Sequence, residues 1–265
     1  MSEMYLVFVV AFLASLLGPL CGIGGGVIIK PVVDAMGILP VAVVSFLSSV
    51  SVLTMSLATL LQNAVSKTST IKVRSMLPVA LGSAAGGAAG KILFNLLSQN
   101  LHDRELVGAY QAAILIILTV IVFIYTLRRS SLKSFRIEKP LVSALIGATA
   151  GALWSFLGIG GGPFNLAILM FFFSMDSKPA AQASLFIIAF SQTASLLYSV
   201  FLGGLPAFEP FMLAGMCLAA LLGSVIGRQI ARRIDSHAVD VLYRCALVLI
   251  ILICCYNFAR FCGIL

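Results

Sequence analysis

Long apolar runs, separated by short polar segments, make up most of the chain. Six of these runs have the length of one membrane-spanning helix, which needs about 20 mostly apolar residues. The other two are too long for one ordinary span, so we expect each to form two helical pieces. The runs cover residues 5–33, 40–62, 76–98, 106–127, 141–174, 180–202, 210–231 and 238–259, the first and fifth being the long ones.

Both long runs are interrupted by the same glycine-rich stretch. Residues 22–26 read Gly-Ile-Gly-Gly-Gly, and residues 158–162 repeat that sequence. Lipid cannot satisfy a bare backbone, so such a break survives only where protein buries it or where it lines a polar cavity. A helix that restarts after the break presents free N–H groups and a positive dipole end, which suits an anion. A matched pair of broken helices, one in each half of a chain, is typical of a transporter's substrate site.

The glycines allow two other interpretations. A dinucleotide-binding loop follows a strand and needs a glycine at its sixth position, where this chain has Val27 and Pro163 inside spanning-length apolar runs. That argues against a nucleotide site. Glycines also let helix backbones approach closely. This packing alternative stays open for either break alone and is weaker for the matched pair.

The two halves of the chain also match beyond the glycines, which indicates an internal duplication. One matched set is a ladder of small residues at every fourth position, closed by a basic residue, and such ladders are typical of closely packed membrane helices. The pairs are Met36 with Met175, Pro40 with Pro179, Ser45 with Ser184, Thr54 with Thr193, Ser56 with Ser195, and Gly82, Gly86, Gly90 and Lys91 with Ala219, Gly223, Gly227 and Arg228. We predict a first repeat over 1–127, a basic cytoplasmic linker over 128–140 and a second repeat over 141–265.

The distribution of lysine and arginine favours one topology, because cytoplasmic segments are enriched in these residues. If all eight runs were simple spans, the basic residues would divide 9 to 8 between the two sides. If each long run turns back at its glycines, 13 lie on one side and 4 on the other. The second model has five segments per half, so the repeats are inverted and both termini lie outside the cytoplasm. The piece 163–174 is about 18 Å of helix, less than a full crossing.

We therefore predict an all-α polytopic membrane protein with two inverted-topology repeats. Each repeat has a glycine-broken hairpin or re-entrant segment plus three transmembrane helices, giving eight apolar runs and up to ten helical segments. Composition agrees: 61% of the 265 residues are hydrophobic, 10% are charged, and mean hydropathy is +1.12. The net charge of +8 sits in connecting segments and is no sign of nucleic-acid binding. We expect a multi-pass protein of the cell (inner or plasma) membrane; whether it forms homo-oligomers is left open.

Enzymatic and cofactor chemistry lack the residues they need. The six cysteines lie mostly in apolar runs and include no Cys-x-x-Cys pair, while His102 and His237 lie in polar segments. No acid pair or activated nucleophile is recognisable. We expect no enzyme, no cofactor and no metal.

Over essentially its whole length the chain resembles the sulfite exporter TauE/SafE family of membrane permeases. The resemblance rests on the duplicated Gly-Ile-Gly-Gly-Gly, on Pro31 after the first copy, on the Met-x-x-x-Pro before the next span, and on the Gly/Ala-rich third span of each half. It implies transport of small sulfur oxyanions or organosulfonates. In the second copy Pro163 follows the glycines at once, and Leu166 stands at the position of Lys30, so the two half-sites differ chemically.

The candidate substrate-binding residues gather at the two breaks and on the spans that follow them. Backbone N–H groups of the glycines can reach oxyanion oxygens because no side chain blocks the approach. Lys30 is either a counter-charge for the anion or a residue that snorkels or pairs with Asp34 one turn on. The side-chain amides are either anion ligands or interhelical contacts. The serine hydroxyls are either anion ligands or are bonded to the backbone of their own helix. The candidates are Gly24, Gly25, Gly26, Lys30, Ser45, Ser48, Gly160, Gly161, Gly162, Asn165, Ser191 and Gln192.

The main functional hypothesis is a secondary transporter of a small sulfur-containing anion such as sulfite, sulfoacetate or a related organosulfonate. It would work by alternating access around a midplane site made by the two breaks. A permease for another small organic or inorganic anion, or a non-transporting membrane scaffold, stays open. All nine acidic residues fall at or near the ends of spans, so no coupling ion can be derived. Carboxylate-based proton coupling would require Asp34 or Asp176 to reach the site.

Overall fold

The computed structural model describes residues 2–100, 104–131, 133–203 and 205–263, and helices dominate these ranges. The helices are α1 (Ser2–Cys21), α2 (Gly26–Met36), α3 (Val41–Val65), α4 (Val73–Asn100), α5 (Arg104–Arg128), η1 (Arg129–Ser131), α6 (Pro140–Leu157), α7 (Gly162–Phe172), α8 (Ser177–Tyr198), η2 (Ser199–Gly203), α9 (Pro210–Ala231) and α10 (Ser236–Phe261). The predicted all-α fold with ten helical segments is confirmed: both long runs divide at their glycines, and no strand occurs in the described ranges.

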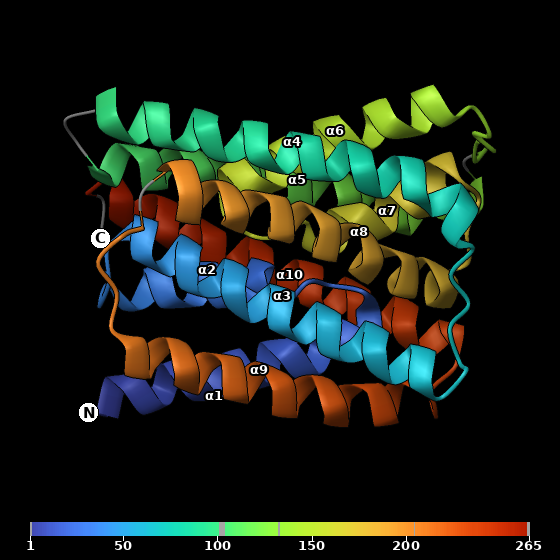
Figure 1. Cartoon of the computed structure of the whole chain (residues 1–265), viewed down its shortest axis with the longest axis horizontal. Helices are drawn as coiled ribbons and strands as arrows, with labels where there is room; N and C mark the ends of the chain where they lie inside the picture. Colours follow the sequence, from blue (N-terminus) through green and yellow to red (C-terminus); the bar gives the residue numbers. More distant parts are fainter. Residues whose placement is uncertain (1, 101–103, 132, 204, 264–265) are drawn as a thin grey trace.

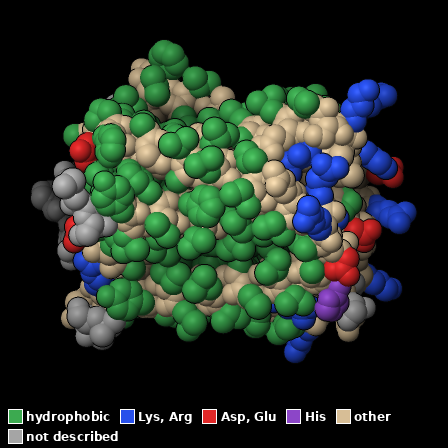
Figure 2. All heavy atoms as spheres, turned by 90° about the horizontal axis from the view of Figure 1, so that it is seen from below, with side chains coloured by type: hydrophobic (Ala, Val, Ile, Leu, Met, Phe, Trp, Pro, Cys, Tyr) green, Lys and Arg blue, Asp and Glu red, His purple; other side chains and the backbone are tan. Residues whose placement is uncertain are grey.

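Eight of the helices are long and apolar enough to cross a membrane. They lie roughly parallel along the long axis of the molecule (Figure 1). Hydrophobic side chains cover the middle of the face seen in Figure 2, while charged side chains gather toward its ends. Exposed large apolar residues occur on many of the long helices, among them Leu13, Leu81, Ile117, Leu145 and Leu222. This distribution is that of a multi-pass membrane protein, since lipid takes the place of water around the apolar belt.

The remaining helices, α2 and α7, are short, with 11 residues each, or about 17 Å of helix. The chain reverses direction before each of them. Backbone N–H groups of Phe135 and Ile137, just before α6, donate to carbonyls of Phe171 and Phe172 at the end of α7. The α6–α7 unit therefore begins and ends at the same end of the molecule. The α1–α2 unit is likewise a hairpin of one long and one short arm (Figure 1).

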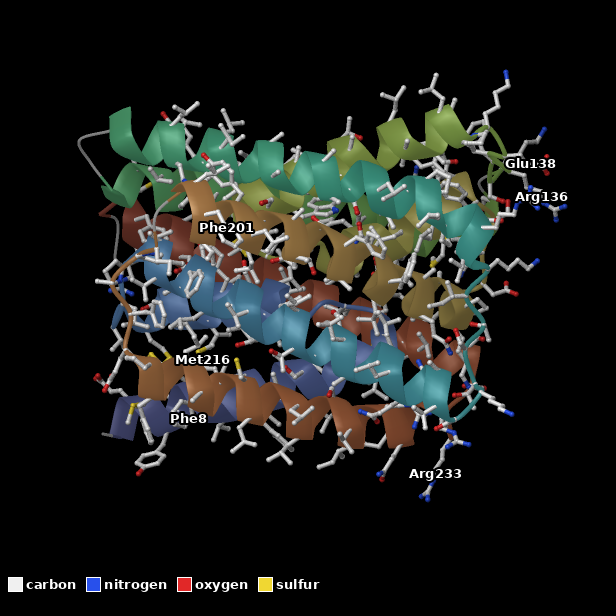
Figure 3. The ribbon with its side chains drawn as sticks, in the orientation of Figure 1. Phe8, Arg136, Glu138, Phe201, Met216 and Arg233 are labelled. Atoms are coloured by element: carbon white, nitrogen blue, oxygen red, sulfur yellow. The ribbon has the colours of Figure 1, made fainter. Side chains whose placement is uncertain are left out.

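The α3–α4, α5–α6 and α9–α10 connections lie together at one end of the molecule (Figure 1). Arg228 near the end of α9 donates to the hydroxyl of Thr68 in the α3–α4 connection. Arg136 and Arg233, from the other two connections, project from this same end (Figure 3). We call it the basic end, because the α5–α6 connection alone carries Lys133, Arg136 and Lys139. The opposite end holds the start of α1 and the end of α10.

Small-residue ladders hold the halves together. A Cβ atom built on Gly82, Gly86 or Gly90 of α4 would run into the carbonyl oxygens of Ala144, Ala148 and Ala152 of α6. In the same way, Gly223 and Gly227 of α9 lie against backbone oxygens of Phe12 and Leu16 of α1. The ladder helix of each half thus packs closely against the first helix of the other half, at opposite edges of the molecule (Figure 1).

The first helices of the two halves, α1 and α6, begin at opposite ends of the molecule (Figure 1). Inverted repeats require this arrangement, and the exchange of ladder partners agrees with it. The duplication itself, and its boundaries at 127 and 141, stay predictions from the sequence.

Candidate substrate site

The first glycine turn joins α1 to α2. Gly22 follows the end of α1 with a φ of 64°, a left-handed conformation that glycine adopts without strain and that commonly ends a helix. Gly25 is the N-cap of α2, and its side-chain position lies against the backbone of Ala14 and Ser15 in α1. All residues of this turn are buried, so the turn is covered by protein.

The second glycine turn joins α6 to α7 and has more residues with a positive φ than the first. Gly158, Gly160 and Gly161 have φ values of 68°, 72° and 100°, so a side chain at any of them would be strained. Pro163 lies in the first turn of α7, where its missing N–H breaks no helical bond. This turn is buried as well.

The two turns come from segments more than a hundred residues apart and lie against each other. A Cβ atom built on Gly26 would lie 2.6 Å from the Ile159 carbonyl oxygen, and one built on Gly162 would lie 2.9 Å from Val27 side-chain carbons. One built on Gly24 would be 3.5 Å from the Gly160 carbonyl oxygen. The motifs therefore meet in the interior, and glycine is needed there because the backbones touch.

The backbone of both turns offers unused donors. Within the described part of the chain, no hydrogen bond is found for the buried N–H groups of Gly24, Gly25, Gly26, Gly160, Gly161 and Gly162. The first N–H groups of a helix lack an intrahelical partner, and the positive end of the helix dipole lies at the same place. Two such helix starts face one another here, which is an arrangement suited to negative charge.

Side chains around the turns also carry buried polar atoms that have no partner among the described residues. Ser45 Oγ lies beside Gly158, and Ser48 Oγ lies beside Gly26, so α3 contacts both turns. Gln192 of α8 lies beside Gly160. A buried polar group without a partner costs free energy, and several of them around one point indicate a site for a polar ligand.

Asn165 in α7 is oriented by a neighbour. Its Oδ1 accepts a hydrogen bond of 2.8 Å from Trp154 Nε1 of α6, which leaves Nδ2 directed toward Gly161 without a partner. The Trp154 indole also stacks on Phe164, with ring centroids 4.6 Å apart. The amide donor of Asn165 is therefore held at the second turn by two aromatic residues.

Comparison with known families now adds to this geometry. The family model described as sulfite exporter TauE/SafE matches residues 7–256. The chain belongs to the TauE/SafE family. No curated protein and no solved structure matches it. The TauE/SafE family is one of membrane transporters, in agreement with the eight apolar helices of this chain.

The TauE/SafE chain brings most of the predicted site residues together. The glycines, Ser45, Ser48, Asn165 and Gln192 lie at the two turns. Ser191 instead lies beside Gly87 of α4, on another face of α8.

Lys30 of α2 is paired with Asp34. Its Nζ lies 2.6 Å from Asp34 Oδ2, and both side chains are about 5% exposed. Asp34 Oδ1 has no hydrogen-bond partner among the described residues. A Cβ atom built on Gly158 would lie 3.2 Å from Lys30 Cε, so the lysine chain packs against the second turn. The sequence left three roles open for Lys30, and the structure shows the pairing with Asp34, at a position beside the second turn.

Several residues that hold the site were not predicted. Trp154 was identifiable as the single tryptophan of the chain. Ser184, the sequence counterpart of Ser45, donates a 2.8 Å hydrogen bond to the Gly22 carbonyl. On α10, Asn257 Nδ2 donates to the Pro31 carbonyl at 2.7 Å, and the Tyr243 hydroxyl donates to the Pro163 carbonyl. One long helix therefore holds both short helices.

Proposed function

We propose that this TauE/SafE protein is a secondary transporter for a small sulfur-containing anion, such as sulfite or an organosulfonate, bound between the two glycine turns. The observation that supports this most directly is the set of buried N–H groups without partners at the two facing helix starts. Sulfite and sulfonate groups carry three oxygens each and need several donors arriving from different directions. Two opposed turns with Asn165 beside them provide such donors.

The site is enclosed by protein in this conformation, so transport requires the helices to move apart on one side and then on the other. The α4–α6 and α1–α9 pairs, each joining one half to the other, are suited to rocking as rigid units. Alternating access of this kind is the usual mechanism of inverted-repeat transporters. By the positive-inside rule, the basic end faces the cytoplasm.

The test is a ligand panel on the purified protein in detergent and in proteoliposomes. Sulfite, thiosulfate, sulfoacetate, taurine and acetate are compared for thermal stabilisation and for uptake. We expect a sulfur anion to raise the melting temperature and to accumulate, and acetate to do neither. Accumulation of acetate alone would show a permease for another anion. Failure of every anion to bind or accumulate would contradict the proposal.

Matched variants test whether the anion binds at the turns. Asn165→Asp keeps the acceptor for Trp154 but replaces the free donor with a negative charge, so we expect anion binding to weaken by about a hundredfold or more. Asn63→Asp is the control, because Asn63 Oδ1 already accepts from Arg228 Nε at 2.7 Å and a carboxylate suits that position. Gly25→Leu and Gly161→Leu should abolish anion-induced stabilisation. Equal behaviour of the two Asn→Asp variants would place the anion elsewhere.

A further inference from the structure

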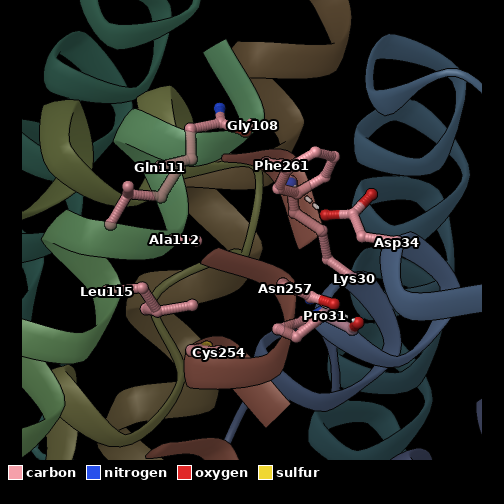
Figure 4. A pocket seen from close by; sticks show the side chains of 11 residues that line it. Lys30, Pro31, Asp34, Gly108, Gln111, Ala112, Leu115, Cys254, Asn257 and Phe261 are labelled. Atoms are coloured by element: carbon pink, nitrogen blue, oxygen red, sulfur yellow. Dashed lines mark hydrogen bonds and ion pairs between the residues drawn. The ribbon is translucent and has the colours of Figure 1, made fainter. Parts of the chain in front are cut away.

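The ion pair between Lys30 and Asp34 lies between the glycine turns and a small cavity. On one side, the Lys30 chain packs against Gly158 of the second turn. On the other side, Lys30 and Asp34 line a cavity between α2, α5 and α10 that has room for about one water molecule. Figure 4 shows the pair on one side of this cavity, with Gln111 and Leu115 of α5 on the opposite side.

The cavity has several acceptor atoms but few donors. Asp34 Oδ1, Gln111 Oε1 and Asn257 Oδ1 are buried, have no hydrogen-bond partner among the described residues, and belong to residues that line it. The amide nitrogens of Gln111 and Asn257 are already engaged, donating to the carbonyls of Phe156 and Pro31. Such a lining can accept hydrogen bonds from a water molecule or from a protonated carboxyl group.

An anion that arrives at the turns competes with Asp34 for Lys30. Lys30 is the cation beside the turns, and its charge is neutralised by Asp34. If the anion takes over the ammonium group, Asp34 is left as a buried carboxylate without its ion-pair partner. A buried ionised group that loses its partner is strongly destabilising, because its charge is then uncompensated in a low-dielectric interior. Protonation of the remaining carboxylate removes most of that penalty.

We propose that Asp34 is a proton-binding site coupled to the anion site, so that the anion and a proton occupy the protein together. This inference rests on the proposed function and adds its coupling ion. The anion replaces Asp34 at Lys30 Nζ, and a proton from bulk water enters through the cavity and binds the carboxylate of Asp34. The negative charge added at Lys30 equals the positive charge added at Asp34. For a singly charged anion, the loaded site therefore carries the same net charge as the free one.

Other charged or titratable groups around Asp34 leave this assignment intact. Arg260 of α10 donates from Nη1 to the backbone carbonyls of Asp34 and Ala35, not to the carboxylate. The Cys254 thiol of α10 lines the cavity, and α5 lines it with Gly108, Gln111, Ala112 and Leu115, none of which titrates. Lys91 of α4 has its Nζ 4.9 Å from the centroid of the Phe94 ring on its own helix.

The decisive measurement is the number of protons taken up when an anion binds. Calorimetric titrations of the whole protein in buffers with different ionisation enthalpies give this number. Sulfoacetate and thiosulfate serve as probes because neither titrates near neutral pH, and sulfite is corrected for its own titration. We expect about one proton taken up per bound anion. In proteoliposomes, an inward proton gradient should raise anion accumulation.

Variants then locate the proton. Asp34→Asn should abolish proton uptake and make anion affinity independent of pH. Without the competing carboxylate, its anion affinity should rise by about tenfold. Glu209→Gln, which removes an exposed acid before α9, is the control and should behave as the wild type. Should Asp34→Asn not fold, the proton count of the wild type decides the question.

Two outcomes would overturn the inference while leaving transport intact: binding of an anion by the wild type without proton uptake, or normal proton uptake by Asp34→Asn. If no anion binds or accumulates at all, the proposed function fails, and this inference fails with it. The two failures are therefore distinguishable in the same set of titrations.

Discussion

The two glycine turns share a sequence and an environment, yet the short helices that follow them differ in charge. Counted from the last glycine, Lys30 and Asp34 of α2 correspond to Leu166 and Met170 of α7. The first pair is a buried ion pair of 2.6 Å, whereas the second pair consists of two buried, uncharged side chains. At these matched positions, therefore, only α2 carries an ion pair.

The second turn is distinguished by neutral donors. Trp154 and Asn165, which hold the free amide at this turn, correspond to Gly18 and Ile29 in the first half. The difference shows a division of roles: both turns contribute backbone N–H groups, the first adds a titratable pair, and the second adds an oriented amide. Under the proposed function, a substrate held between them would meet two chemically different surfaces, in line with the departure of the second copy noted in the sequence.

An arginine from elsewhere in the chain binds carbonyl groups at or just after the end of each short helix. Arg260 of α10 donates to the carbonyls of Asp34 and Ala35 at the end of α2. Arg129, just after α5, donates to the carbonyl of Met175 after α7. An arginine at a helix C-terminus satisfies free carbonyls and opposes the negative dipole end. The end of α2 is thus fastened by α10 of the second repeat, and the segment after α7 by the linker that follows α5.

The largest expected effect comes from removing the charge that distinguishes α2. The double change Lys30→Met with Asp34→Leu replaces a buried pair with apolar side chains, and such a replacement is commonly neutral for stability. We expect the protein to fold and anion affinity to fall by about a hundredfold. Leu166→Met at the matching position of α7 is the control, with affinity unchanged within about twofold. Isothermal titration with the anion identified by the panel measures both.

A smaller effect, on stability, should distinguish the two turns when a glycine of each is replaced by alanine. Gly161 has a φ of 100°, and an added Cβ would lie 2.5 Å from Asn165 Nδ2, whereas the nearest atom to an added Cβ on Gly25 is 3.2 Å away. Gly161→Ala should lower the free energy of unfolding by about 2 kcal/mol and Gly25→Ala by about 1 kcal/mol or less. Thermal unfolding in one detergent compares them. The reverse order would show that the second turn relaxes easily.

Loss of either arginine should loosen one short helix and leave the other unchanged. Arg260→Gln should cost about 1–2 kcal/mol of stability, because two carbonyls lose a charged donor. Faster amide hydrogen exchange is expected at the end of α2 for this variant. Arg129→Gln should speed exchange around Met175 instead. Mass spectrometry of the exchanged peptides reports both, and equal exchange at both helices in either variant would show that the two arginines do not act separately.

The smallest effect concerns the hydroxyls of α3, which contact one turn each. Ser45→Ala and Ser48→Ala remove buried hydroxyls that have no partner in the described structure, so each should weaken anion binding by about three- to tenfold if it donates to the anion. Ser51→Ala is the matched control, because Ser51 Oγ already donates to the Leu47 carbonyl of its own helix at 2.9 Å. Affinities of the three variants equal to the wild type would remove α3 from the site.

The sequence was sufficient for the helices, the breaks and the membrane environment, because each depends on local features. Run length marks a span, and repeated glycine within a run marks a break. The small-residue ladders were also predictable as close helix contacts, because spacing by four places them on one face of a helix. The partner helix was not: Gly82 packs on α6 and Gly223 on α1, which no local pattern indicates.

The partners of the polar residues were decided by the tertiary structure. The spacing of Lys30 and Asp34 permits an ion pair, but an exposed lysine at that spacing would extend toward the interface. Burial of both side chains against α5, α10 and the second turn makes the pair form. The hydrogen bond from Asn257 to Pro31 and that from Arg260 to Asp34 each join residues 226 positions apart.

The sequence by itself thus determined which segments cross the membrane, where two of them break, and which residue types stand near each break. The tertiary structure alone decided that the two breaks touch, that Ser191 faces α4 while Gln192 faces a turn, and that Lys30 pairs with Asp34 beside the second turn. The physical reason is the distance along the chain over which each effect acts. The length of an apolar run and the conformational freedom of glycine are local properties of the sequence. Burial and pairing depend on neighbours that only the packing of α1 to α10 brings together.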